Sequence, residues 1–230
     1  MYFASDNSGP AHPEVLAALA SANTGYAMPY GADTIMDEVR ETLRSIFQAP
    51  EASVYLVATG TAANALALAT MCAPYETVFC SPTAHIHEDE CNAPEFYTAG
   101  AKLSIVGTQD QMTPETLRSS IEAQQTRGVH GPQRGPVSIT QVTERGAVHS
   151  LAEIKALSDV AKSYGLGVHL DGARFANAQA ALGCSAAEMT WKAGVDVVSF
   201  GGTKNGCMGV EAVIFFDPTK AWEFELRRKR

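Results

Sequence analysis

Lys204 lies among small residues in the stretch SFGGTKNG, residues 199–206, which continues the apolar run VDVVSF. A lysine held between glycines at the carboxyl end of a strand has little conformational freedom, and a partly desolvated amine is suited to forming a Schiff base. The alternative is a lysine that extends from a glycine turn so that its ammonium group reaches solvent. Other parts of the chain are needed to decide between these two interpretations.

An aspartate follows a second apolar strand. In GVHLDGARFANA, residues 167–178, Asp171 ends the strand and Arg174 comes three positions later. Ligands of open α/β sheets bind outside the carboxyl ends of the strands, so an acid at this place is positioned for function. An Asp171–Arg174 pair that only caps the following helix fits the local sequence equally well.

A small-residue turn joins a strand to a helix in VYLVATGTAANALALA, residues 54–69, at Thr59, Gly60 and Thr61. Such a turn directs backbone N–H groups and the positive end of the helix dipole outward, which suits a phosphate. Threonine also caps helices without any ligand. The turn is neither a P-loop nor the GxGxxG of dinucleotide-binding folds, because the required Lys and Gly positions are absent.

The segment TAHIHEDECNAPEF, residues 83–96, contains two histidines and several acids. His85, His87 and Glu90 could ligate a metal, or the carboxylates could simply keep a loop in solvent. A histidine beside an aromatic cofactor is a third interpretation, since imidazole stacks on rings and transfers protons. We expect no metal site.

The order of these features predicts pyridoxal 5′-phosphate as a cofactor. The turn at Gly60 would hold the phosphate, and His85 would cover one face of the ring. Asp171 would keep the pyridine nitrogen protonated, and Lys204 would form the Schiff base.

The elements that position these residues alternate along the chain from about residue 52. The predicted strands are VYLVA, TVFCS, KLSIVG, PVSITQV, GVHLD, DVVSF and VEAVIFF. The predicted helices between and after them are TAANALALATMC, TPETLRSSIEAQQ, SLAEIKALSDVAKSYG, ARFANAQAAL and PTKAWEFELRRKR. This alternation predicts an α/β fold, a three-layer α/β/α arrangement with a mostly parallel sheet.

The first fifty residues differ from the rest. Two predicted helices, AHPEVLAALASA and DTIMDEVRETLRSIFQ, flank NTGYAMPYGA, whose Gly, Pro and Tyr residues make it a candidate binding loop. We therefore expect an N-terminal helical arm with an active-site loop over residues 1–50 and a cofactor-binding large domain over residues 51–230.

Composition excludes several classes of protein. The net charge of −8 and the confinement of dense basic charge to RRKR at residues 227–230 argue against a nucleic-acid partner. No apolar run has the ~18–20 residues of a membrane helix, and the N-terminus lacks the layout of a signal peptide. The five cysteines form no CxxC pair, so neither a disulfide framework nor a zinc site is expected. We expect a cytoplasmic protein.

With these motifs in place, the chain resembles the low-specificity L-threonine aldolases, which are fold-type-I pyridoxal-phosphate enzymes shaped like aspartate aminotransferase. The resemblance extends over nearly the whole chain. It rests on SDNSGPAHPEVLAAL, YGAD, ATGTAANALAL, AHIHEDE, VHLDGARFANA and SFGGTKNG.

The resemblance implies a role for each matching residue. Lys204 would be the Schiff-base lysine with Thr203 as a cofactor contact beside it, Asp171 the partner of the pyridinium nitrogen, and His85 the stacked imidazole. Gly60 and Thr61 would contact the phosphate. Arg174 would contact the cofactor as well, and together with Ser5 would hold the substrate carboxylate. Tyr30 would reach the site of a neighbouring subunit in a homodimer or homotetramer.

Two features depart from the family's pattern. Glu144 stands where many relatives carry a histidine, and it is expected to contact the substrate. The relatives continue into a small carboxyl-terminal domain beyond the segment that matches this chain, so the chain is expected to be the large domain of a longer protein.

The resemblance implies cleavage of L-threonine, L-allo-threonine and related β-hydroxy amino acids to glycine and an aldehyde. His85, Glu144 or a water could remove the hydroxyl proton. The alternatives are another fold-type-I enzyme, either a β-eliminating lyase or an aminotransferase, and a non-catalytic domain that only binds the cofactor. A plain nucleotide-binding domain would need neither Lys204 nor Asp171.

Overall fold

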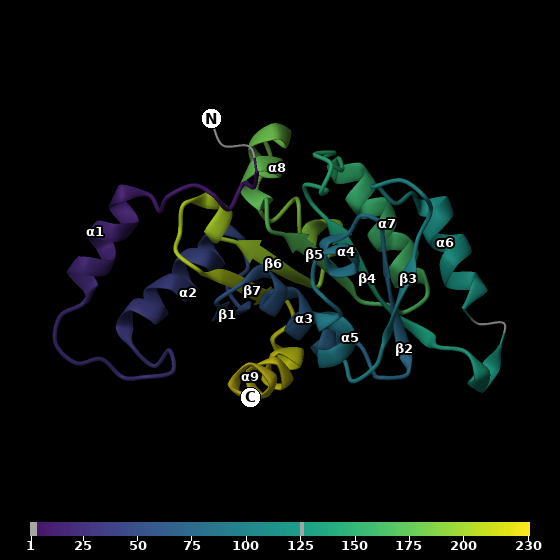
Figure 1. Cartoon of the computed structure of the whole chain (residues 1–230), viewed down its shortest axis with the longest axis horizontal. Coiled ribbons are helices and arrows are strands. Elements are labelled where there is room, and N and C mark those ends of the chain that lie inside the picture. The colour runs from purple at the N-terminus through teal and green to yellow at the C-terminus, as the bar shows by residue number, and fades with distance from the viewer. Residues whose placement is uncertain (1–3, 125–126) are drawn as a thin grey trace.

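A seven-stranded sheet forms the centre of the protein in the computed structural model, which describes residues 4–124 and 127–230 (Figure 1). The strands are β1 Ser53–Val57, β2 Glu76–Cys80, β3 Lys102–Ile105, β4 Gln133–Thr140, β5 Val168–Gly172, β6 Val197–Gly201 and β7 Glu211–Phe215. Their order is β1-β7-β6-β5-β4-β2-β3. All strand pairs from β3 to β6 are parallel, and only β7 runs antiparallel to its neighbours β6 and β1. The predicted strands and the mostly parallel sheet are confirmed.

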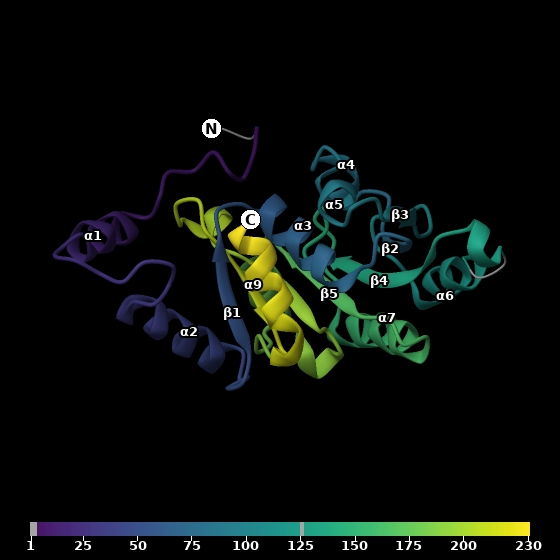
Figure 2. The same ribbon diagram turned by 90° about the horizontal axis from the view of Figure 1, so that it is seen from below.

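Helices cover both faces of this sheet. They are α1 Pro13–Ala22, α2 Thr34–Ile46, α3 Gly60–Met71, α4 His85–Glu88, α5 Ala93–Tyr97, α6 Pro114–Ala123, α7 Leu151–Ser163, α8 Phe175–Leu182 and α9 Ala221–Lys229. Figure 2 shows α3, α4 and α5 on one side of the sheet and α2 and α7 on the other. The prediction missed α4 and α5, because each is only about one turn long. The last position of the predicted helix TPETLRSSIEAQQ, residue 125, lies outside the described residues.

Local sequence explains where the longer helices begin and end. At the start of α7, the Ser150 side chain accepts from the Glu153 N–H and the Glu153 carboxylate accepts from the Ser150 N–H, so a capping box is formed. Gly165 follows the helix with a φ of 73°, a conformation that glycine adopts without strain. The residue types at both ends thus explain where this helix begins and ends.

Two packed layers join the helices to the sheet. On one face, Phe215 and Phe224 pack with Val213 and with alanines of α3. On the other, Phe47 and Phe175 are fully buried, with ring centroids 5.4 Å apart. Among the described residues no helix is long and apolar enough to cross a membrane. The division of the chain between residues 50 and 51 stays a prediction.

Helix α1 projects away from the sheet and buries no side chain (Figures 1 and 2). Leu16 and Leu19 are about half exposed, and Tyr26 in the following loop is fully exposed. An apolar helix gains little from burial in this position, because no segment within the described residues buries its side chains.

A histidine ties three strands together inside the core. His169 of β5 is fully buried, with Nδ1 2.9 Å from Ser138 Oγ on β4 and Nε2 2.9 Å from Ser199 Oγ on β6. Burial lowers the pKa of His169 to about 4, below its ordinary value of 6.5.

This histidine is expected to make the fold sensitive to acid. Because the folded-state pKa is depressed, the unfolded chain takes up a proton first, and stability that is complete above pH 6.5 is lost as the pH falls toward 4. The loss at pH 4.5 should be about 2–3 kcal/mol. Urea unfolding at pH 7 and pH 4.5 measures it. His169→Asn, whose amide can replace the Nδ1 contact with Ser138 but is too short for the Nε2 contact with Ser199, should weaken the pH dependence by that amount, and an unchanged dependence would contradict the assignment.

Candidate active site

A cavity of about 450 Å³ opens at the carboxyl ends of the parallel strands. Its lining includes seven residues singled out by the sequence: Thr59, Gly60, Thr61, His85, Asp171, Thr203 and Lys204. Segments far apart in the sequence therefore meet here, because parallel strands end at one edge of the sheet. Four other predicted residues, Ser5, Tyr30, Glu144 and Arg174, are outside this lining.

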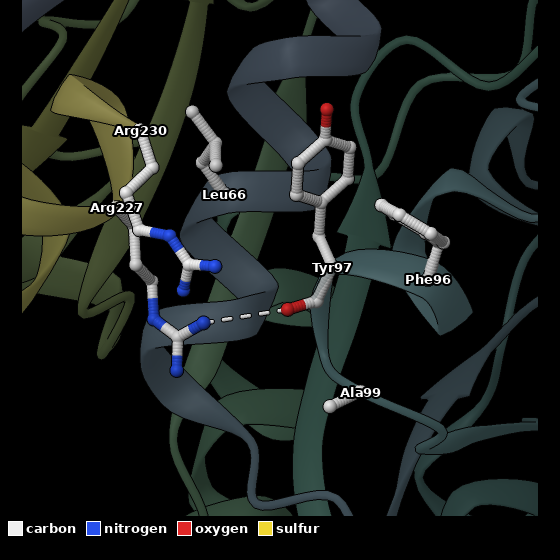
Figure 3. Close-up of a pocket in the computed structure, with 6 residues that line it drawn as sticks. All are labelled: Leu66, Phe96, Tyr97, Ala99, Arg227 and Arg230. Carbon is white, nitrogen blue, oxygen red and sulfur yellow. Dashed lines mark hydrogen bonds between the residues drawn. The ribbon is translucent and has the colours of Figure 1, made fainter.

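A second cavity, of about 440 Å³, lies between α3, α5 and α9 (Figure 3). It is lined by Leu66, Phe96, Tyr97, Ala99, Arg227 and Arg230. Arg227 donates to the backbone carbonyl of Tyr97 across it, as the dashed line marks. None of its residues was predicted to carry chemistry.

The Thr59 turn leaves donors free at the start of α3. The Thr59 side chain accepts from the Ala62 N–H at 3.1 Å, and α3 begins at Gly60. Since the first N–H groups of a helix have no partner within it, those of Gly60 and Thr61 remain for a ligand. A Cβ at Gly60 would meet no heavy atom within 4 Å, so the space beside the turn is open. The turn is thus both capped by threonine and available to an anion.

Gly60→Ala tests this space. The protein should fold with unchanged stability, because the added methyl group contacts nothing. Affinity for a phosphate-bearing cofactor should fall roughly tenfold, because the methyl group narrows the approach to the helix N-terminus. Cofactor titration followed by fluorescence, beside thermal unfolding, measures both effects. A variant that binds the cofactor as tightly as the parent would show that the turn does not contact the cofactor phosphate.

Asp171 is a buried acid without a cation. Only 3% of it is exposed; Oδ1 accepts from the Ala173 N–H at 3.1 Å and Oδ2 accepts from Asn64 Nδ2 at 2.9 Å. Among the residues that the structure describes, no Lys, Arg or His side chain lies within ion-pair distance of it. The alternative pair with Arg174 does not form. A buried carboxylate in this state is suited to a cationic group on a ligand.

Lys204 lies in the 3-10 helix Thr203–Asn205, directly after β6. Its side chain is 14% exposed, and Nζ lies 3.5 Å from Asp6 Oδ1. The flanking glycines are required by close backbone packing: a Cβ at Gly202 would lie 2.6 Å from the Val210 carbonyl oxygen. The alternative of a lysine reaching into solvent therefore does not describe Lys204.

Arg174 stands beside the cavity between two carboxylates. It donates to Asp6 and, through Nη1, to Glu144 Oε1 at 3.1 Å. Burial opposes ionisation of Asp6, but the hydrogen bond from Arg174 and the charge of Lys204 hold the pKa of Asp6 below its usual value. Ser5 adjoins this cluster and accepts from the Asn7 N–H at 3.1 Å.

His85 begins the short helix α4, and its Nδ1 lies 2.9 Å from Glu90 Oε1. The hydrogen bond to Glu90 raises the pKa of His85, although burial opposes the rise. His87 is exposed, so the three candidate metal ligands of this segment do not share one site. No set of three His, Cys, Asp or Glu side chains within residues 4–124 and 127–230 could hold a metal ion.

Tyr30 lies outside the cavity of its own chain. It is 79% exposed, and Lys229 Nζ lies 3.8 Å from its ring centroid. Its expected contact with a neighbouring subunit stays a prediction.

Two polar residues of the site, Asn64 and Glu211, were given no role from the sequence, and Glu90 was named only as a possible metal ligand. Asn64 bonds to both Asp171 and Glu90, and Glu211 accepts from the Gly202 N–H at 2.8 Å. The one available signal was Asn64 itself, because an asparagine inside an alanine-rich helix is unfavourable without a partner. Nothing in the local sequence reveals the through-space contacts of Glu90 or Glu211.

Comparison with known proteins agrees with the motifs. The low-specificity L-threonine aldolase of Pseudomonas aeruginosa is 45% identical over 229 residues, which are 99% of this chain and 65% of that protein. A second protein of that name, from a Pseudomonas species, is 44% identical over the same shares. The chain thus spans about two thirds of the length of these relatives.

Structural comparison and the family match point the same way. The solved threonine aldolase of Leishmania major superposes with a TM-score of 0.87 at 25% identity, covering 97% of this chain and 66% of that one. The family model described as β-eliminating lyase matches residues 2–229. The chain therefore belongs to the β-eliminating lyase family.

Proposed function

We propose that this chain binds pyridoxal 5′-phosphate and forms the part of a threonine aldolase that cleaves L-threonine, L-allo-threonine and related β-hydroxy amino acids to glycine and an aldehyde. One observation carries the proposal. The buried Asp171, which has no cationic partner in the described part of the chain, and the confined Lys204 face one cavity beside a free helix N-terminus. The high identity to proteins named low-specificity L-threonine aldolase supports the choice of reaction.

The residues present fit the cofactor. The N–H groups of Gly60 and Thr61 would hold the phosphate, Lys204 would hold the aldehyde carbon, and Asp171 would pair with the pyridine nitrogen. Arg174 and Thr203 would add contacts at the edge of the site. When bound, the cofactor supplies an electron sink for the charge that develops at the substrate Cα.

Proton transfer at the substrate hydroxyl is proposed for His85. Its Nδ1 is bound to Glu90, and Nε2 is the ring nitrogen left for a substrate proton. Glu144, the other side-chain candidate, already accepts from Arg174 at 3.1 Å, so it is proposed to contact the substrate rather than to act as the base.

Arg174 and Ser5 are proposed to hold the substrate carboxylate. The Asp6 carboxylate contacts both Arg174 and Lys204, which supports the proposal because an anion is stabilised at this place. A substrate carboxylate would bind in the same positive field.

A homodimer or homotetramer is proposed as the assembly. The uncovered apolar residues of α1 and the following loop, with Tyr30 at its end, would be buried against a second copy. Sedimentation at micromolar concentration tests this, and a monomer would contradict it. A cytoplasmic location is proposed from the five free cysteines.

The family name favours β-elimination as a second candidate. Glycine is the ligand that tests aldol cleavage, because it is a product of that reaction, whereas it carries no group that β-elimination could remove. Adding glycine to the chain loaded with pyridoxal phosphate should change the visible absorption spectrum at millimolar concentration. A spectrum that does not respond to glycine would count against the aldolase.

A further inference from the structure

Glu90 is a buried carboxylate behind His85. Its side chain has no exposed surface. Oε1 lies 2.9 Å from His85 Nδ1 and accepts from Asn64 Nδ2 at 2.8 Å, while Oε2 is buried with no hydrogen-bond partner among the described residues. Such a group is costly to bury, so its retention here requires a reason beyond packing.

Asn64 connects this carboxylate to the second acid of the site. Its Nδ2 donates to Glu90 Oε1 at 2.8 Å and to Asp171 Oδ2 at 2.9 Å. An amide group has two N–H donors, so each carboxylate receives one of them. The result is a continuous row, His85–Glu90–Asn64–Asp171, whose two ends both line the cavity.

We propose that Glu90 is a positioning residue that holds the Nδ1 proton of His85 and thereby directs Nε2 of the ring into the cavity, with Asn64 fixing the Glu90 carboxylate in place. The inference deepens the proposed function, since it assigns the residue that prepares His85 for proton transfer. A carboxylate that fixes the tautomer of a histidine is an arrangement used widely to orient imidazoles.

The charges around His85 agree with this role. The hydrogen bond to Glu90 is the largest influence that raises the pKa of His85, burial opposes it, and the charges of Glu90, Asp171 and Glu144 add to the rise. Asp89 and Lys204 also line the cavity. Removing the charge of Glu90 should therefore lower the pKa of His85, while the other groups remain.

Nitrogen-15 NMR of the histidine side chains in the cofactor-free chain tests the proposal without any assay of activity. In the wild type, neutral His85 should carry its proton on Nδ1. Glu90→Gln should lower the pH at which His85 titrates by about one unit. The matched control is Glu88→Gln. Glu88 is exposed on α4, the short helix that His85 begins, and its replacement should change the pH at which His85 titrates by less than about 0.3 unit.

Two results would overturn the proposal. One is a neutral wild-type His85 with its proton on Nε2, which needs no variant to fold. The other is an equal titration of His85 in Glu90→Gln and in the wild type. Because both readings come from the cofactor-free chain, they are independent of whether threonine is the substrate. An inactive chain with the expected His85 response would reject the proposed function and keep the role of Glu90.

Discussion

Lys204→Ala is expected to abolish the visible absorption band of protein-bound pyridoxal phosphate and to reduce threonine cleavage by roughly 10⁴-fold or more, a loss typical of removing a covalently acting residue. The reason is positional. Lys204 is the lysine that lines the cavity holding Asp171 and the Thr59 turn. Absorbance of the protein after gel filtration and single-turnover assays of glycine formation measure the two effects.

Lys102→Ala is the matched control for that experiment. Lys102 is exposed on β3, at the edge of the sheet, so its replacement should leave both the band and the rate unchanged. A Lys204 variant that keeps the band and full activity would contradict the proposal that Lys204 binds pyridoxal phosphate.

Asp171→Asn is expected to retain the cofactor but to lose roughly 10²–10³-fold in kcat, because an amide cannot stabilise a pyridinium charge as a carboxylate does. The replacement has nearly the same shape. Its side-chain oxygen can still accept from the Ala173 N–H, the contact that Asp171 Oδ1 makes at 3.1 Å. The rate at saturating cofactor and threonine, measured beside cofactor affinity, separates catalysis from binding.

Asp159→Asn is the control for this change of charge. Asp159 is exposed on α7, where it pairs with Lys155 on the helix surface, so its loss should alter neither rate nor affinity. An Asp171 variant with unchanged kcat would mean that this acid only caps the chain after β5.

The sheet could be predicted from sequence because its strands are short apolar runs bounded by turn residues. PVSI of β4 is fully buried and VVSF of β6 nearly so, which favours a largely apolar composition, and helices with alanine and leucine at helical spacing lie between them. The same layout places Asp171 and Lys204 at one edge, so the centre of the site was also predictable.

Contacts between distant segments could not be predicted in this way. Asn64 and Asp171 are separated by 107 positions, and Arg174 meets Asp6 across 168. A local pattern carries no information on such pairs. The sequence near Arg174 suggested an ion pair with Asp171, whereas in the structure Arg174 pairs with Asp6 and Glu144. The exposed α1 is a further case, since its composition predicts a helix but not what covers it.

Products formed from L-threonine by the purified chain with added pyridoxal phosphate test the central claim most directly. Aldol cleavage breaks the Cα–Cβ bond and yields glycine and acetaldehyde, whereas β-elimination removes the hydroxyl group and yields 2-oxobutanoate and ammonia. After subtraction of the products formed by Lys204→Ala, we expect glycine and acetaldehyde in equal amounts. Formation of 2-oxobutanoate and ammonia without glycine would contradict it.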